Sequence, residues 1–465
     1  MRKHLIGLFL ALPAILVSLN CGGYSSGNNT KNSGIHDRAF ISDSVNVAGI
    51  YIVNVQTDVH PQGLTPIPAG NTPGIMAVTP NRAQTVVFSG NNTQFSDNLF
   101  SIINNTSENA AATVTLPGYT ESMIISPDSS TAYIAIPSGP VVGQSPGKIE
   151  MVAIAAALVA GEVDIPSVHY LSISNDGNRL LAFTDVMSSL GAPCDPTPSF
   201  LFVVTPSDVG IQPCPAVPVT GFDHPVQAYF SSDDSVAYVV NCGAECGGVQ
   251  ASIQQLDMTS NTLIGPAADV CAPATPGVAQ QCAASVALVD GSTMYLAGTP
   301  YIDGQPSQAC TGQTTQATTC GLLTIFDLST MSVVNTTPII ITDGYHNRIA
   351  MGSNGQLFIG ARTCTEIQQP NPTNEIRGCL SIYNTLGTAV GSVPAGGVAI
   401  PPMNGDATGL QPIATRTVVY VIQGGSLRIY DTTIDDLEFN PNDPKNPGQV
   451  FGLVGDFIDV KTVDF

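Results

Sequence analysis

The chain has 465 residues, of which 43% are hydrophobic and only 11% charged, and its formal net charge is −21. Such an acidic chain repels nucleic acid and anionic membrane surfaces, which argues against both as partners. Its 45 glycines and 35 prolines leave little room for long helices and indicate a β-rich protein with many turns.

The first residues are typical of an export signal. Arg2, Lys3 and His4 precede the apolar run 5–19, which is too short and wrongly flanked for a stable membrane span. Cys21 follows directly, and the polar stretch 22–36 comes next. We therefore expect a signal peptide over residues 1–20, a lipidated Cys21 as the mature N-terminus, and a flexible linker over 21–37. An ordinary secretory signal cleaved nearby is the alternative.

A short pattern then recurs eight times from residue 38 to the C-terminus. A loop ending in Ser/Thr-Pro-Asp or a variant leads into a hydrophobic strand with a central large residue, and a second alternating strand follows. The central residues lie 45 to 63 positions apart and are Phe40, Phe88, Tyr133, Leu181, Tyr238, Tyr295, Phe358 and Tyr420. A period of this length made of four short strands is typical of a radial repeat fold.

The repeats predict an all-β chain, a single β-propeller over residues 38–465 with four-stranded blades. Eight blades fit the count, and seven is the alternative if the strand 410–415 belongs elsewhere. The first unit lacks an inner strand, whereas the last unit ends with an extra alternating segment, 458–463. We expect this C-terminal strand to complete the first blade, because closing the ring removes open sheet edges.

Three of these stretches resemble the YVTN family of β-propeller repeats, found in bacterial and archaeal surface proteins and close to the lactonase-like propellers. The family phrase stands here as Ser126-Pro127-Asp128 with 132–135, as Tyr238-Val239-Val240-Asn241, and as 324–327. The absence of Trp removes the signature of WD-type propellers. The resemblance implies the architecture and no particular activity.

Eleven cysteines are present, and ten remain to pair once Cys21 is set aside. An exported chain meets an oxidising compartment, where such cysteines form disulfides. Metal binding is the competing interpretation, but no Cys-x-x-Cys is present. The expected pairs are Cys242/Cys246, Cys271/Cys282, Cys310/Cys320, Cys364/Cys379 and Cys194/Cys214. The predicted location is the outer membrane or cell surface, with the periplasm as the alternative.

Candidate binding residues precede the expected inner strands, on the face where the longer loops also lie. This position places them around the mouth of a central channel, where they could bind a polar ligand. They are Glu121, His169, His224, Tyr345, His346 and Arg348. Solvated side chains on polar loops are the alternative. The acidic loop from Asp435 to Asp443 offers oxygen ligands for Ca²⁺, without EF-hand spacing, so a solvated acidic turn is the alternative there.

The one catalytic pattern present, G-x-S-x-G at residues 143–147, matches in letters only, because Pro146 has no backbone N–H for an oxyanion and a strand is expected to follow instead of a helix. The sequence lacks a phosphate-binding Gly-Lys loop, an H-E-x-x-H motif and a dinucleotide fingerprint. We therefore predict no catalytic residues, no metal and no cofactor, and favour a binding or interaction scaffold over an enzyme. The alternatives are a lactonase-like hydrolase using the same face and a structural surface-layer component. The predicted partner is an unknown protein or a small polar ligand, with membrane contact only through the N-terminal lipid, and the chain is expected to be a monomer.

Overall fold

The structure is a computed structural model of the whole chain. It describes residues 32–45, 47–90, 97–139, 146–271, 282–302, 305–306, 319–368, 375–390, 393–438, 448–450 and 452–465. All of them belong to one unit, Asn32–Phe465. Within these ranges, no helix is both long and apolar enough to cross a membrane.

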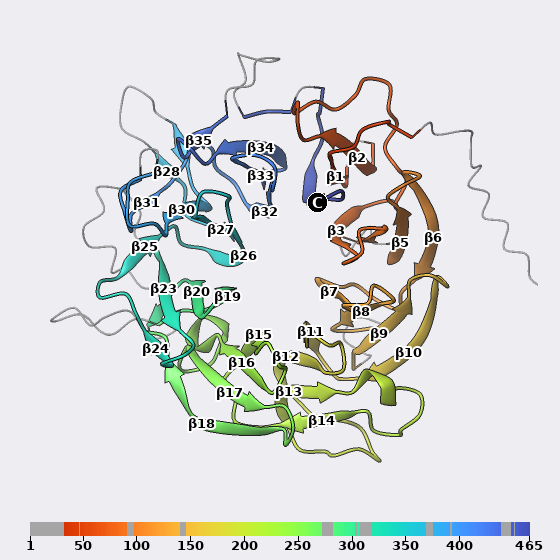
Figure 1. Cartoon of the computed structure of the whole chain (residues 1–465). Helices are drawn as coiled ribbons and strands as arrows, with labels where there is room; N and C mark the ends of the chain where they lie inside the picture. Colours follow the sequence, from red (N-terminus) through yellow and green to blue (C-terminus); the bar gives the residue numbers. More distant parts are fainter. Residues whose placement is uncertain are drawn as a thin grey trace, which may run out of the picture. The chain divides into compact units, whose positions relative to one another are not determined.

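Eight antiparallel sheets follow one another around a ring in this unit (Figure 1), which confirms the predicted eight-bladed β-propeller. The inner strands of neighbouring sheets contact one another all the way round. The first four blades are β36 (Phe457–Thr462), β1 (Arg38–Asp43) and β2 (Gly49–Asn54); β3 (Pro73–Val78), β4 (Gln84–Ser89), β5 (Leu99–Asn104) and β6 (Asn109–Thr115); β7 (Ser122–Ile125), β8 (Thr131–Ile136), β9 (Lys148–Ala153) and β10 (Leu158–Asp164); and β11 (Val168–Ile173), β12 (Leu180–Ser188), β13 (Ser199–Val204) and β14 (Ala216–Val219).

The last four blades carry the insertions. They are β15 (Pro225–Phe230), β16 (Val236–Asn241), β17 (Ser252–Asp257) and β18 (Thr262–Asp269); β19 (Val286–Asp290), β20 (Thr293–Gly298), β23 (Gly321–Asp327), β24 (Ser332–Val333) and β25 (Ile339–Ile341); β26 (Tyr345–Met351), β27 (Gln356–Arg362), β30 (Leu380–Asn384) and β31 (Val398–Ala399); and β32 (Ala407–Pro412), β33 (Val418–Gln423), β34 (Ser426–Asp431) and β35 (Asp436–Leu437). The inserted elements are the hairpins β21 (Tyr301–Ile302) with β22 (Gln305–Pro306) and β28 (Ile367–Gln368) with β29 (Ile376–Arg377), and the 3₁₀ turns η1 (Pro206–Asp208) and η2 (Gly243–Cys246).

Burial falls from the middle of each blade to its outer edge. In β8 five of six residues are buried, whereas β6 alternates exposed and partly buried residues and β18 is almost wholly exposed. This gradient explains why the hydrophobic second and third strands were easy to find in the sequence, because they are covered on both faces by neighbouring blades.

The predicted Ser-Pro-Asp turns are confirmed in their hydrogen bonding. Ser126 Oγ donates to Asp128 Oδ1 (2.5 Å), and the backbone N–H of Ser130 donates to the same oxygen (3.0 Å). Hydrogen bonds to the ionised carboxylate, the one from Ser126 first, hold the pKa of Asp128 below its ordinary value. The Ser174–Asp176 and Ser231–Asp233 side chains pair in the same way.

The first blade differs from the four-stranded prediction. Its sheet has three strands, and the outer position holds only two isolated bridges, Ile50 with Ile67 and Asn54 with Val59. The physical reason is the composition of the segment 57–72, because its prolines at 61, 66 and 68 have no N–H to donate to a sheet.

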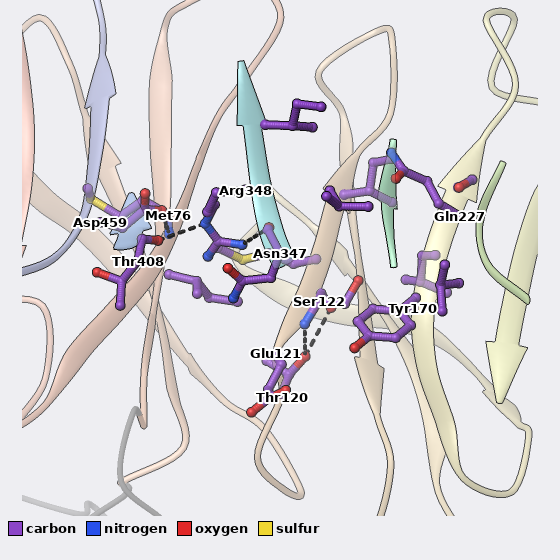
Figure 2. Close-up of a pocket in the computed structure, with 18 of the residues that line it drawn as sticks. Met76, Thr120, Glu121, Ser122, Tyr170, Gln227, Asn347, Arg348, Thr408 and Asp459 are labelled. Carbon is purple, nitrogen blue, oxygen red and sulfur yellow. Dashed lines mark hydrogen bonds between the residues drawn. The ribbon is translucent and has the colours of Figure 1, made fainter. Parts of the chain in front are cut away.

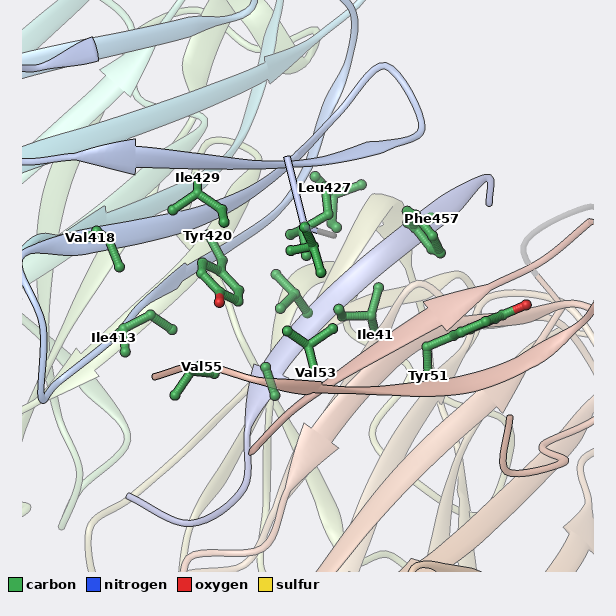
Figure 3. Packing of buried hydrophobic residues seen from close by; sticks show 14 residues of the cluster. Ile41, Tyr51, Val53, Val55, Ile413, Val418, Tyr420, Leu427, Ile429 and Phe457 are labelled. Atoms are coloured by element: carbon green, nitrogen blue, oxygen red, sulfur yellow. The ribbon is translucent and has the colours of Figure 1, made fainter. Parts of the chain in front are cut away.

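The C-terminal strand closes the ring as predicted. β36 pairs antiparallel with β1, with Ile41 opposite Val460 and Ala39 opposite Thr462. Figure 3 shows the apolar cluster that packs where the first and eighth blades meet, and Tyr420 and Phe457 belong to it. The first and last strands of the propeller are thus joined by both backbone pairing and side-chain burial.

Candidate functional site

A central cavity of about 890 Å³ is lined by residues from the inner strands of all eight blades, β36, β3, β7, β11, β15, β19, β26 and β32. Figure 2 shows part of this lining. The cavity mixes apolar side chains such as Met76 and Leu410 with charged ones such as Glu121 and Arg348. A concave site of this size and mixed lining is suited to a small organic ligand.

The inner strands share an irregularity that decides which side chains face the cavity. Among the described residues, β3, β11, β15, β26 and β32 each show a register shift near their start. In four of them a single residue is skipped in the pairing, namely His169, Val226, Asn347 and Thr408. A β-bulge of this kind re-aims side chains. Val226, Asn347 and Thr408 all line the cavity.

Three side chains form a hydrogen-bonded cluster at the mouth of the cavity. The Tyr119 hydroxyl donates to Glu121 Oε1 (3.1 Å), and His169 Nε2 lies 3.5 Å from Glu121 Oε2. The contact with His169 is the main cause that lowers the pKa of Glu121, against a partial burial that acts in the opposite direction. Burial raises the pKa of Tyr119, so its hydroxyl stays protonated. The cluster therefore presents an ionised carboxylate at neutral pH.

Two tyrosines reach across the mouth from blades that are not neighbours. The hydroxyl of Tyr170, on β11 of the fourth blade, is hydrogen-bonded to the hydroxyl of Tyr345, on β26 of the seventh. Burial is the main cause that raises the pKa of both. Both also line the cavity, so this pair narrows its opening.

Glu245 lies near this pair, in the 3₁₀ turn η2. Its Oε2 accepts the backbone N–H of Thr299 (3.1 Å), and burial raises its pKa from 4.5 to about 8. Its charge, when present, is one of the influences that raise the pKa of Tyr345. Glu245 is therefore a protonated acid at neutral pH, whereas Glu121 is ionised.

Two arginines of the seventh blade enter the cavity. Arg348 donates from Nε to the carbonyl of Thr408 (2.7 Å) and from Nη1 to the carbonyl of Asn347 (2.9 Å). Arg362 lies at the end of β27, and its charge acts on the pKa of Glu121 and of Tyr170. Among the described residues, neither arginine lies within 4.0 Å of a carboxylate.

The structure brings some of the predicted site residues together and separates others. Glu121, Tyr345 and Arg348 line the cavity, whereas His169 is not part of the lining and contacts Glu121. His346 is 0% exposed, and its Nε2 lies 2.9 Å from the carbonyl oxygen of Thr342, so it cannot contact a ligand in the cavity. Burial lowers its pKa to about 4, which keeps the ring neutral.

His224 also lies apart from the cavity lining. Its Nδ1 is 3.1 Å from Asp223 Oδ1, and its ring centroid is 4.4 Å from that of Phe200. The three predicted histidines thus occupy three separate environments. The physical reason in the seventh blade is the bulge, because it turns Asn347 and Arg348 to the cavity and leaves His346 in the interior.

Tyr170, Asn347, Arg362 and Thr408 are cavity residues that the sequence analysis missed. Tyr170 and Asn347 directly follow two predicted histidines, so adjacency was a usable signal. Arg362 ends a second strand instead of preceding an inner one, and nothing in the pattern marks it. Thr408 depends on a bulge, which the sequence does not reveal.

The predicted calcium loop is described only in part, because its residues 439–443 lie outside the described ranges. Asp435 is buried and its Oδ1 accepts Gln356 Nε2 (3.1 Å), while Glu438 pairs with Arg416. Burial raises the pKa of Asp435 to about 6. In the described part of the chain, no group of three or more His, Cys, Asp or Glu is arranged to hold a metal ion. Calcium binding there stays a prediction.

Four of the five predicted disulfides are present among the described residues: Cys194–Cys214, Cys242–Cys246, Cys271–Cys282 and Cys364–Cys379. The bonded pairs support an oxidising compartment for this chain.

The fifth predicted pair, Cys310 with Cys320, differs from the other four because the structure describes only one of its members. Cys320 is buried directly before β23 and takes part in a disulfide. Cys310 lies outside the described residues, as does the predicted lipidation site Cys21. The pairing of Cys320 with Cys310 and the lipidation of Cys21 therefore stay predictions.

No protein-family model and no curated protein sequence matches this chain. Solved structures do resemble it. The hydrazine synthase of Kuenenia stuttgartiensis is similar with a TM-score of 0.50 and 12% identity, over 81% of this chain and 99% of that one. The dihydro-heme d1 dehydrogenase NirN is similar with a TM-score of 0.51 and 10% identity, over 94% of this chain and 77% of that one. At such identities the likeness shows the fold alone: this chain is an eight-bladed β-propeller.

Proposed function

We propose that this chain is an exported, lipid-anchored propeller of the YVTN type that binds a small polar ligand in its central cavity and performs no chemistry on it. Export is supported by the charged and apolar start of the sequence and by the four disulfides. The anchor is Cys21, and residues 21–37 act as the linker between the lipid and the propeller.

The observation that carries the proposal is the cavity of about 890 Å³ with polar side chains from several blades. Glu121, Tyr345 and Arg348 come from the third and seventh blades and line one concave space. A ring of packed blades holds them in place, so little conformational entropy is lost when a ligand binds. A small ligand fits such a concave site better than a protein partner, whose flat interface would need a larger exposed area.

The test is a thermal-shift screen of the purified protein with small polar metabolites, followed by calorimetric titration of the hits. A ligand that binds in the cavity raises the melting temperature by mass action. Replacing Glu121 by Gln and Tyr345 by Ala is expected to weaken its binding by about tenfold or more. His224→Ala is the matched control, because that side chain lies outside the cavity lining. Equal affinity in the wild type and in both cavity variants would reject the cavity as the site.

A lactonase-like hydrolase is the second candidate, favoured by the contact between Glu121 and His169 at the cavity mouth. A carboxylate beside an imidazole can orient a general base. Hydrolysis of simple lactones by the wild-type protein, lost in His169→Ala, would establish this function in place of the first. A wild-type rate no higher than that of the His169→Ala variant would reject it.

A further inference from the structure

Two of the three cations that line the central cavity make no ion pair with a carboxylate in the described part of the chain. The third, Lys461, pairs with Asp459 (2.8 Å). Among the residues that the structure describes, Arg348 and Arg362 contact no carboxylate, although this protein carries an excess of acid; Arg82, Arg179 and Arg428 share that feature but lie outside the cavity lining.

The two guanidinium groups also repel each other. Burial is the main cause that lowers the pKa of Arg348, the negative charge of Asp459 acts in the opposite direction, and the positive charge of Arg362 lowers the pKa further. Like charges in a partly desolvated wall raise the free energy of the empty site, and an anion between them would lower it. Arg348 uses Nε and Nη1 for the carbonyls of Thr408 and Asn347, which leaves Nη2 for the cavity.

Unsatisfied polar atoms lie on the same wall. Arg362 Nε, Asn347 Oδ1 and Thr408 Oγ1 are buried and have no hydrogen-bond partner among the described residues. Figure 2 shows Asn347, Arg348 and Thr408 next to one another. Buried polar groups are nearly always hydrogen-bonded in folded proteins, so the two donors at this place, Arg362 Nε and Thr408 Oγ1, indicate a missing acceptor, whereas Asn347 Oδ1 is itself an acceptor.

The acidic side chains of the cavity are already engaged. Asp459 accepts the N–H of Met76 (3.0 Å) and pairs with Lys461, and Glu121 is paired with His169. Asp406 Oδ1 accepts the N–H of Thr363 (2.8 Å). These contacts hold the negative charges in place, while the arginines have only carbonyl contacts or none.

We propose that the wall formed by Asn347, Arg348, Arg362 and Thr408 binds the oxyanion of an organic anion, a carboxylate or a phosphate. Arg348 Nη2 and the Arg362 guanidinium donate to the anion, and the Thr408 hydroxyl donates a further hydrogen bond. The apolar body of the ligand lies against Met76, Ile349 and Leu410, which line the same cavity. This inference rests on the proposed function and specifies its ligand class.

The test measures binding of benzoate and phenyl phosphate to the full-length protein by calorimetric titration, with benzamide as the uncharged analogue of the same shape. At least one anion is expected to bind about tenfold or more tightly than benzamide. The stronger of the two identifies the carboxylate or the phosphate as the preferred group. If neither anion binds more tightly than benzamide up to about 10 mM, where a millimolar Kd is still measurable, the inference is wrong.

The variants locate the binding. Arg362→Gln is the primary one, because its side chain makes no hydrogen bond in the described part of the chain and its loss should not disturb the fold. We expect it to weaken anion binding roughly ten- to a hundredfold and to leave benzamide unaffected. Arg348→Lys retains the charge and loses the forked donors, and it should weaken binding as well.

Arg179→Gln is the matched control, since the Arg179 side chain contacts Thr205 and does not line the cavity, and its removal changes the net charge as Arg362→Gln does. If Arg179→Gln lowers anion affinity as much as Arg362→Gln does, the effect is one of net charge, and the site is rejected. If benzoate and benzamide bind alike and Tyr345→Ala weakens both, the cavity remains the binding site and only the anion inference fails.

Discussion

The charged contacts of Arg38 link the start of the propeller to its end. Replacing Arg38 by Gln should therefore lower the free energy of unfolding and weaken the pairing of the closing strand β36. Arg38 donates to both carboxylate oxygens of Asp464, to Glu108 Oε1 (2.8 Å) and to the carbonyl of Asn105. The side chains of Arg38 and Glu108 are only 9% and 3% exposed. Removing the arginine leaves a buried carboxylate without its partner, which costs about 3–5 kcal/mol in comparable buried pairs.

We expect the lower end, about 3 kcal/mol, because Asp464 is partly solvated. The assay is equilibrium urea unfolding, combined with hydrogen exchange of the amides in β36. Those amides should lose protection before the other inner strands do, since β36 is held by pairing with β1. Arg179→Gln, in the turn between β11 and β12, should change stability by less than about 0.5 kcal/mol. A loss below about 1 kcal/mol for Arg38→Gln, or unchanged exchange in β36, would refute the role of this contact in closing the ring.

Three further predictions follow from single observations. Intact-mass analysis of the mature protein should show lipid on Cys21 and no thiol that alkylates without reductant; an unmodified N-terminus or an alkylated thiol would contradict this. Val460→Ala, at a buried position of the closing strand β36, should lower the free energy of unfolding in urea by about 2 kcal/mol. Val159→Ala, in the outer strand β10 where Val159 is 40% exposed, should lower it by less than about 0.5 kcal/mol. Burial raises the pKa of Glu245 from 4.5 to about 8, so between these pH values the folded state holds a proton that the unfolded chain releases. Thermal stability should therefore fall as pH rises from 4.5 to about 8, and Glu245→Gln should reduce that fall. A pH dependence of stability that is the same in the variant and the wild type would contradict the burial of this carboxyl.

The blade count could be read from the sequence because each blade repeats the same physical requirement. Its second strand is covered on both faces, so residues such as Phe88, Tyr133 and Phe358 must be large and apolar. In the turns before these strands Pro presets the backbone φ angle and Asp hydrogen-bonds the backbone, so these residue types recur in the sequence at the turns. The closing strand was predictable for the same reason, since an unpaired alternating segment at one end matched a missing strand at the other.

The site was predicted only in part, because facing the cavity depends on register and register is set by bulges. Position in the repeat correctly indicated Glu121, Tyr345 and Arg348 as residues of the cavity wall. The same reasoning failed to exclude His346, which stands next to two cavity residues and is itself buried. A one-residue shift in a strand moves a side chain to the opposite face, and no local sequence signal reported that shift.

The bulges also explain how a repetitive ring can hold a specific site. Eight similar inner strands would surround a nearly uniform channel, and such a channel could not orient a ligand. The skipped residues break this uniformity: Val226 in the fifth blade is apolar, whereas Asn347 and Thr408 in the seventh and eighth blades are polar, and their side-chain oxygens have no hydrogen-bond partner among the described residues. His169 in the fourth blade instead contacts Glu121. The cavity therefore has an arginine-bearing wall on two adjacent blades and a carboxylate-bearing cluster on two others, and a ligand with one anionic end has a single favourable orientation between them.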